Sequence, residues 1–314
     1  MQFVVPFDIP ALDEKIAHKD KVLLLGSCFT EHIAQNLRTG GMQVSANPNG
    51  IQFNPNSMAA CLRNCMEGTL PTEDQLFLHQ ELWRHWQFHS AYCHTDKLAA
   101  LQGMQESVRA AQSFLKEAQW LLVTFGSSFQ YFYRQDEGDM LPVANCHKVP
   151  GQKFDKRMLS VADMHQQWSQ VMAQLKSFNP NIKIIFTVSP VRHLRDGLVA
   201  NNQSKARLIE LTHQLVAEHP YSAYFPAYEL VVDVLRDYRF FEPDKAHPSE
   251  DAVRYVWRAF QESCIDDASI GIIKQFKALH DALAHRPRFA DTEAHRIFLE
   301  RNRKKMEDLK ARYK

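Results

Sequence analysis

The sequence predicts an α/β protein with a doubly wound parallel sheet of about five strands, followed by C-terminal helices. Short apolar runs recur near residues 22, 43, 121, 183 and 222. Stretches with the apolar spacing of amphipathic helices separate these runs, and such alternation indicates parallel strands joined by right-handed crossovers. The hydrophobic content of 45%, with 20 Phe, is ample for a packed core.

The first unit is a strand, a turn and a helix within residues 21–41. Val22 to Leu25 is continuously apolar, as expected for a strand covered on both faces. Helical spacing begins directly after Gly26-Ser27, and Gly40-Gly41 ends it. The hydroxyl of Ser27 is thereby placed at the carboxyl edge of the sheet, where ligands bind in open α/β folds. A plain helix cap is the structural alternative for Ser27.

The next segments are read from turn residues and caps. A strand at about 42–46 runs into a loop rich in Asn, Pro and Gly at 47–50, and Asn56 or Ser57 then begins a helix through about Met66. The aromatic-rich residues 76–94 predict short strands or an irregular insertion. We expect their aromatic side chains to pack on the body of the protein in preference to stacking on a sugar.

The rest of the main domain continues the alternation of strands and helices. Its predicted elements are helices at 96–117, 160–178, 202–218, 229–238 and 249–264, and strands at 120–125, 183–188 and 221–224. We expect one domain over residues 1–265, with an insertion at about 70–95, and a helical extension over 266–314. Residues 274–314 carry 12 Lys and Arg against 6 Asp and Glu, which favours a solvated hairpin or a homodimer contact over a nucleic-acid arm.

Composition limits the class of protein and its partners. Lys+Arg 37 against Asp+Glu 36 leaves a net charge of +1, so no global basic field indicates a nucleic-acid partner. No apolar stretch approaches the roughly 20 residues that span a bilayer, and residues 1–8 lack the pattern of a signal peptide. The six cysteines are scattered, which favours reduced thiols. We therefore expect a cytoplasmic protein without a membrane partner.

Three features that are distant in sequence converge at one edge of such a sheet: Ser27, the loop at 47–50, and the pair Asp244 and His247. A serine hydroxyl is a poor nucleophile until a histidine takes its proton, and a carboxylate must orient that imidazole. Asp244 and His247 are three residues apart just before a helix, so their side chains can point to one side. Backbone N–H groups of Ser27 and Gly50 would hold a developing oxyanion.

At these residues the chain resembles the GSCFA domain family, which is related to SGNH/GDSL-type esterases. Gly26-Ser27-Cys28-Phe29-Thr30 is similar to the Gly-Ser-Cys-Phe-Ala signature, and the resemblance continues through segments 47–51, 143–148, 187–193 and 244–257. It implies a three-layer, flavodoxin-like α/β/α hydrolase fold without a metal. By the same resemblance, Ser27 matches the nucleophile, Gly50 the glycine of the second block, and Asp244 and His247 the Asp-x-x-His of the last block.

The chain departs from the SGNH pattern in two blocks. The usual Gly-Asp-Ser reads Leu25-Gly26-Ser27, so the acidic residue is missing, and Gly126-Ser127-Ser128-Phe129 lacks the asparagine of the third block. The side-chain donor to an oxyanion is then expected from one of three residues, Asn49, Ser128 or Asn145.

Four more side chains near the predicted edge are candidates for the site. We expect His147 and His193 to contact substrate or to hydrogen-bond the site, because no helix offers a His-x-x-x-His metal clamp. Arg192 either binds an anionic substrate group or forms a surface ion pair. Cys28 is the alternative nucleophile, because a thiol at a helix N-terminus can be reactive. A turn should aim only one of two adjacent side chains at the site, and the SGNH pattern selects Ser27.

The sequence therefore predicts a serine esterase or acyltransferase that needs no cofactor. O-acyl groups on carbohydrate are the first substrate class to consider, by analogy with SGNH relatives. The alternative is a non-catalytic ligand- or carbohydrate-binding protein, which the missing asparagine favours. A nucleotide-binding protein ranks third, because neither G-x-G-x-x-G nor G-x-x-x-x-G-K-[ST] is present.

Overall fold

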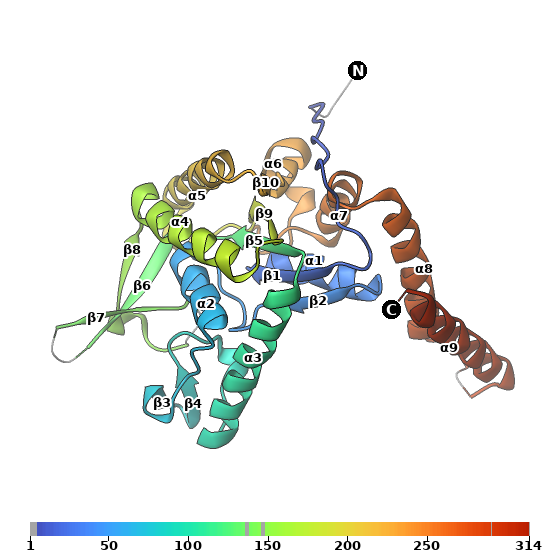
Figure 1. The fold of residues 1–314 in the computed structure, drawn as a ribbon, viewed down its shortest axis with the longest axis horizontal. Helices are drawn as coiled ribbons and strands as arrows, with labels where there is room; N and C mark the ends of the chain where they lie inside the picture. Colours follow the sequence, from blue (N-terminus) through green and yellow to red (C-terminus); the bar gives the residue numbers. More distant parts are fainter. Residues whose placement is uncertain (1–4, 136–137, 146–147, 290, 314) are drawn as a thin grey trace.

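The centre of the molecule is a five-stranded parallel sheet (Figure 1). The computed structural model describes residues 5–135, 138–145, 148–289 and 291–313. The sheet has the order β10-β9-β5-β1-β2, which is the flavodoxin-like order, and this confirms the predicted fold class. Its strands are β1 (Lys21–Gly26), β2 (Gln43–Ala46), β5 (Trp120–Phe125), β9 (Lys183–Val188) and β10 (Ser222–Tyr224).

Helices cover both faces of this sheet, so that three layers form (Figure 1). Leu23 and Leu25 face the layer of α2 (Pro55–Glu67), α3 (Lys97–Glu117), α4 (Val161–Phe178) and α5 (Leu198–Glu218). Val22 and Leu24 face α1 (Cys28–Thr39) and α7 (Glu250–Cys264). Because both faces of β1 are covered, its sequence is continuously apolar instead of alternating.

Most helices begin where a side chain caps the first free amides. Asp96 accepts a hydrogen bond of 2.7 Å from the Ala99 N–H, and Ser160 accepts one of 3.1 Å from the Asp163 N–H. Helix α2 begins earlier than predicted, because Asn54 is the cap and Pro55 occupies the first helical position, where no N–H is needed. Helix α5 also begins earlier, at Leu198, so Asn201 lies inside the helix.

Two antiparallel sheets lie beside the main sheet. The aromatic insertion contains the hairpin of β3 (Leu76–His79) and β4 (Leu82–His85), as predicted. The sheet of β6 (Phe129–Arg134), β7 (Met140–Val143) and β8 (Phe154–Met158) was predicted to be a loop. Pro142 argues against a strand in the sequence, and the structure tolerates it because β7 is an edge strand.

The aromatic insertion packs on this second sheet. Trp86 lies between Phe77 and Tyr133, with ring centroids 3.8 Å and 4.4 Å away. Both faces of the Trp86 indole are therefore covered by other rings. This arrangement agrees with packing and not with a free platform for stacking on a sugar.

The C-terminal part is helical. Helix α6 (Ala227–Glu229) leads into a π-helix, η5 (Leu230–Leu235), and α7 is followed by α8 (Asp267–Ala284) and α9 (Glu293–Tyr313). Helices α8 and α9 form a hairpin that projects from the body at the right of Figure 1. In the described residues, no helix has the length and apolar character needed to cross a membrane.

Single 3₁₀ turns lie at Glu73–Gln75 (η1), Ser90–Tyr92 (η2), Gly151–Lys153 (η3), Leu194–Asp196 (η4) and Tyr238–Phe240 (η6).

Candidate active site

The candidate site lies at the carboxyl edge of the sheet, between β1 and β5. The connections after these two strands run in opposite directions along the sheet, which makes this the topological switch point of the fold. Ser27 and Cys28 follow β1, Gly126 follows β5, and Ser189 follows β9. The strand order therefore brings together the candidates that follow β1, β5 and β9.

Asp244 and His247 form a hydrogen-bonded pair on the turn before α7. Oδ2 of Asp244 lies 2.6 Å from Nδ1 of His247, and Oδ1 accepts the backbone N–H groups of Ala246 and His247 at 2.9 Å and 3.0 Å. These amides and the imidazole lower the pKa of the Asp244 carboxyl to about 2. The carboxylate therefore fixes the imidazole orientation and leaves Nε2 available.

The side chain that faces Nε2 of His247 is that of Cys28. Its Sγ lies 3.9 Å from Nε2. Ser27, the predicted nucleophile, is 4% exposed and its hydroxyl donates to Oγ of Ser189 at 3.1 Å. Ser27 precedes α1, but its side chain caps none of the helix amides. The structure thus brings Cys28, and not Ser27, against the imidazole, because adjacent side chains on this turn point to different sides.

A signal for this arrangement exists in the sequence. When Gly26-Ser27-Cys28 is set directly against Gly-Asp-Ser, the glycines coincide and Cys28 takes the position of the serine. Ser27 then stands where the acidic residue was missing. Our prediction instead shifted the motif by one residue to align serine with serine.

Cys28 is half-buried at the first position of α1. Burial raises the pKa of the Cys28 thiol, while the N–H groups of Cys28 and Phe29 and the charge of Lys205 act in the opposite direction. The thiol is therefore protonated at rest near neutral pH, and a neighbouring base has to accept its proton. The two amides belong to the first turn of a helix, where N–H groups lack intrahelical partners, and they are donors suited to an oxyanion.

The loop at 47–50 supports the end of β1 but does not offer the predicted donors. The N–H of Gly50 donates to the Asn47 oxygen at 2.7 Å and closes a turn, at a φ of +76° where a Cβ would collide with His89. Asn49 is buried, and its Nδ2 donates to the Gln87 oxygen at 3.2 Å. Instead, Asn47 acts on β1, because its Oδ1 accepts the Gly26 N–H at 2.9 Å.

The other predicted oxyanion donors are also engaged elsewhere. Ser128 is fully buried, and its Oγ donates to Oγ of Ser204 at 3.0 Å. Nδ2 of Asn145 donates to the Phe129 oxygen at 3.5 Å, and its Oδ1 accepts a hydrogen bond of 2.7 Å from Asn54. His147 lies outside the described residues. The donors that the described residues present to Cys28 are therefore the backbone amides at the start of α1.

His193 lies beside the pair, as predicted for a residue at this edge. Its ring packs on Phe53 with centroids 4.9 Å apart, and its backbone N–H donates to Oδ1 of Asn201 at 2.9 Å. Burial and the positive charge of Lys205 lower the pKa of His193 to about 4. This imidazole is therefore neutral at pH 7 and suited to hydrogen-bonding a substrate without adding charge.

Arg192 braces the turn that carries Asp244 and His247. Its backbone N–H donates to the Ala246 oxygen at 3.0 Å, and its Nη1 donates to the Lys245 oxygen at 3.2 Å. The guanidinium also lies over the Phe241 ring, 4.1 Å from the centroid. Arg192 is thus engaged with backbone and ring, and its contact with an anionic substrate group stays a prediction.

We expect Arg192→Ala to loosen this turn. Loss of the guanidinium should increase deuterium uptake by the backbone of residues 242–249, because the Lys245 oxygen and the Phe241 ring lose the contacts that hold them. Arg239→Ala is the matched control, since Arg239 forms an exposed ion pair with Asp237 next to the same turn. Equal uptake in wild type and Arg192→Ala, measured by hydrogen exchange and mass spectrometry, would contradict this role.

Lys205 is the residue of the site that the sequence prediction missed. It is 1% exposed on α5, and its Nζ donates to the backbone oxygens of Gly126 and Ser189, each at 2.6 Å. It lies on the buried stripe of α5, with Asn201 and Leu208 a turn away on either side. The sequence did carry a signal for it, because helical spacing places this lysine on the face of α5 that is expected to be buried.

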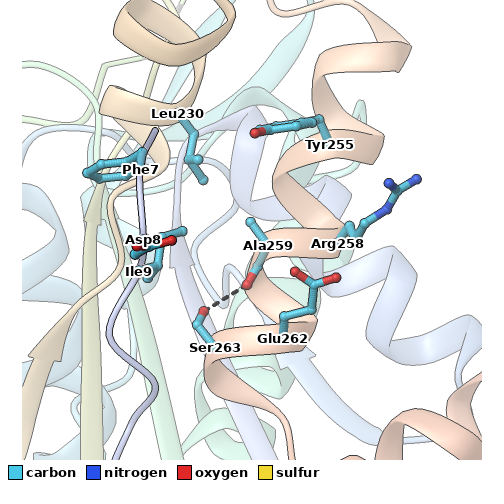
Figure 2. A pocket seen from close by; sticks show the side chains of 9 residues that line it. All are labelled: Phe7, Asp8, Ile9, Leu230, Tyr255, Arg258, Ala259, Glu262 and Ser263. Carbon is cyan, nitrogen blue, oxygen red and sulfur yellow. Dashed lines mark hydrogen bonds between the residues drawn. The ribbon is translucent and has the colours of Figure 1, made fainter. Parts of the chain in front are cut away.

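A separate hollow of about 480 Å³ lies between the N-terminal segment and α7 (Figure 2). None of the candidate site residues lines it. Phe7, Ile9 and Leu230 line one side of the hollow, and Tyr255, Arg258 and Glu262 line the other.

In the part of the chain that the structure describes, no three His, Cys, Asp or Glu side chains gather as metal ligands.

Comparisons with known proteins place the chain in a family. Similar solved structures include a family 3 carbohydrate esterase of Clostridium thermocellum and a carbohydrate esterase family 3 protein from Talaromyces cellulolyticus. Each has a TM-score of 0.37 and 9% identity, over 82% of this chain and 99% of the other. No curated protein matches the sequence. The C-terminal domain of GSCFA domain proteins matches residues 276–314, and the GSCFA family matches residues 21–260. As its motifs predicted, the chain belongs to the GSCFA family.

Proposed function

We propose that this protein is a cysteine-dependent acyl-transfer enzyme that hydrolyses small acyl esters or passes the acyl group to an acceptor. Cys28 is the nucleophile, His247 the general base and acid, and Asp244 the group that orients the imidazole. One observation carries this proposal: Sγ of Cys28 lies 3.9 Å from an imidazole nitrogen whose partner nitrogen is held by a carboxylate. That is the nucleophile–base–orienter arrangement of catalytic triads.

The proposed reaction has two halves. His247 accepts the thiol proton while Sγ attacks the acyl carbon, and the carbonyl electron pair moves to oxygen, where the amides of Cys28 and Phe29 stabilise it. The tetrahedral species collapses, the C–O bond of the ester breaks, and His247 returns its proton to the leaving alkoxide. Water or an acceptor hydroxyl then attacks the thioester with His247 as base, and the thiol is released.

Ser27 is not the nucleophile in this proposal. Its hydroxyl is buried and hydrogen-bonded to Ser189, so it would have to leave that contact to reach an acyl group. Among esters, small O-acyl groups on carbohydrate remain the first substrate class to screen, as the sequence suggested.

Trapping of the acyl-enzyme tests the proposal and separates the two adjacent candidates. The protein is mixed with p-nitrophenyl acetate, quenched in acid and digested, and the acetylated residue is located by mass spectrometry. We expect acetyl on Cys28, removed by neutral hydroxylamine as thioesters are, lost in Cys28→Ala and retained in Ser27→Ala. Cys93→Ala is the control, because Cys93 is also a half-buried free thiol but lies against Arg84 instead of an imidazole.

Two outcomes of this experiment would contradict the proposal. Acetyl on Ser27 that resists neutral hydroxylamine and survives Cys28→Ala would overturn the assignment of Cys28 and restore the serine. Absence of any acetylated residue in folded wild type, with several ester substrates, would favour the non-catalytic binding protein.

A further inference from the structure

The side chain of Asn47 completes the end of β1. The strand register pairs Leu24 with Ala46, the last residue of β2. It pairs Gly26 with Thr124 of β5. The Gly26 N–H therefore lies beyond the end of β2, and Oδ1 of Asn47 accepts it at 2.9 Å in place of a strand carbonyl. Asn47 is itself held to β1, because its backbone N–H donates to the Leu24 oxygen at 2.9 Å.

The same side chain also holds the first turn of α1. Nδ2 of Asn47 donates to Oε1 of Glu31, which lies one turn into the helix. Gly26 and Glu31 stand on either side of Cys28 in the sequence. One side-chain amide therefore bridges the strand and the helix on both sides of the turn that carries the candidate nucleophile.

Few residue types can make both of these contacts. The Gly26 N–H requires an acceptor and the Glu31 carboxylate requires a donor, and a side-chain amide offers one of each. Asparagine also suits the backbone, because residue 47 has a φ of +49°, in the left-handed region that asparagine tolerates better than most residues. Asn47 is 5% exposed, so water does not replace its buried hydrogen bond to Gly26 when that bond is lost.

Close packing at Gly26 transmits any movement of this turn. A Cβ on Gly26 would lie 2.5 Å from Oγ1 of Thr30 and 2.6 Å from the Thr124 oxygen, so Gly26 fits closely between α1 and β5. A shift of Gly26 therefore moves the start of α1 and the thiol of Cys28. The imidazole of His247, 3.9 Å from Sγ, is carried by a separate turn before α7 and does not move with it.

We propose that Asn47 is a positioning residue that fixes the turn from Gly26 to Cys28, so that Sγ of Cys28 faces the imidazole of His247. The inference rests on the cysteine chemistry proposed above and adds to it the group that sets the direction of the thiol. In the described residues, Asn47 makes no hydrogen bond to Cys28 or His247. It therefore acts through the backbone of the turn and takes no part in the reaction.

A double-mutant cycle on the reactivity of the thiol tests this role without an ester substrate. Alkylation of Cys28 by iodoacetamide near neutral pH is followed on the Cys28 peptide by mass spectrometry. In this reaction Sγ bonds to the methylene carbon, iodide leaves, and His247 accepts the thiol proton. The proteins compared are wild type, Asn47→Gly, His247→Ala and the double variant. Glycine adopts the φ of residue 47 freely, so Asn47→Gly removes the side chain without straining the loop.

We expect Asn47→Gly and His247→Ala each to slow alkylation roughly tenfold, and the double variant to be no slower than His247→Ala. A thiol that has turned away from the imidazole has already lost its base, so removal of that base costs nothing further. Gln80→Gly is the matched control, because Gln80 has the same φ of +49° in the exposed turn between β3 and β4. Effects of Asn47 and His247 that simply multiply, or no effect of either single change, would overturn the positioning role.

A rescue separates positioning from a general loss of stability. Asn47→Asp keeps an acceptor for the Gly26 N–H but sets a second carboxylate against Glu31, and it should slow alkylation. Adding Glu31→Gln exchanges carboxylate and amide, keeps the net charge and rebuilds the bridge. The rate should then return to within about threefold of wild type. No recovery in this variant, when circular dichroism shows it folded, would overturn the proposal even if Asn47→Gly does not fold.

Failure of the acyl-enzyme proposal is recognised separately. It appears as absence of acetyl on Cys28, while Asn47 and His247 still show coupled effects on alkylation.

Discussion

Replacing His247 with alanine should lower kcat/KM for ester hydrolysis about 10³-fold. The thiol of Cys28 is protonated at rest because burial raises its pKa, so the imidazole must accept its proton during attack. Positioned general bases of this kind contribute roughly 10²- to 10⁴-fold. The rate is measured with p-nitrophenyl acetate under conditions where the uncatalysed reaction is subtracted.

The side chain of His247 is 48% exposed, which permits a second readout. Added imidazole should enter the space left in His247→Ala and restore part of the rate, whereas it should not rescue Cys28→Ala. His32→Ala is the matched control, since His32 is an exposed histidine on α1, one turn after Cys28. Asp244→Asn should lower the rate about 10²-fold, because the imidazole loses the carboxylate that fixes its tautomer. A His247→Ala protein within threefold of wild type would end the triad interpretation.

Replacing Trp168 with alanine should cost about 3–5 kcal/mol of unfolding free energy. The indole is fully buried on α4, with its ring 5.0 Å from Phe125 and 5.6 Å from Phe186 between centroids. Its Nε1 also donates to the Pro55 oxygen at 3.0 Å, so the variant leaves a cavity and loses a buried hydrogen bond to the start of α2.

Urea unfolding followed by far-ultraviolet circular dichroism measures this loss. Val199→Ala on α5 is the control, because Val199 is 75% exposed and should change stability by less than about 0.5 kcal/mol. A loss below about 1.5 kcal/mol for Trp168→Ala would mean that α4 does not pack on the sheet as described. Equal losses in both variants would mean the same.

Local signals were sufficient for most of the fold. The apolar run at β1 predicts a strand, and the caps Asp96 and Ser160 predict the starts of helices. The folded structure keeps all three. The sheet of β6, β7 and β8 was not predictable in this way. Pro142 and aromatic side chains without alternation conceal its strands, which become strands through pairing with one another.

The sequence predicted which residues lie at this edge of the sheet better than it predicted their contacts. Asp244 and His247 could be placed because their interaction is local. The choice between Ser27 and Cys28 depends on which of two adjacent side chains faces an imidazole that lies far away in the sequence. Gly50 and Ser128 are at the predicted edge, but their donors are satisfied by Asn47 and Ser204, partners that only the folded chain brings close.

Helix α1 has the candidate nucleophile at its first residue and the C-terminal hairpin at its far end, where Gly40 and Gly41 lie against Ile273 and Phe276 of α8. Twelve residues of helix span about 18 Å. The candidate nucleophile and the C-terminal hairpin therefore lie at opposite ends of α1. A change in the C-terminal hairpin of this chain would therefore act at the end of α1 opposite the thiol.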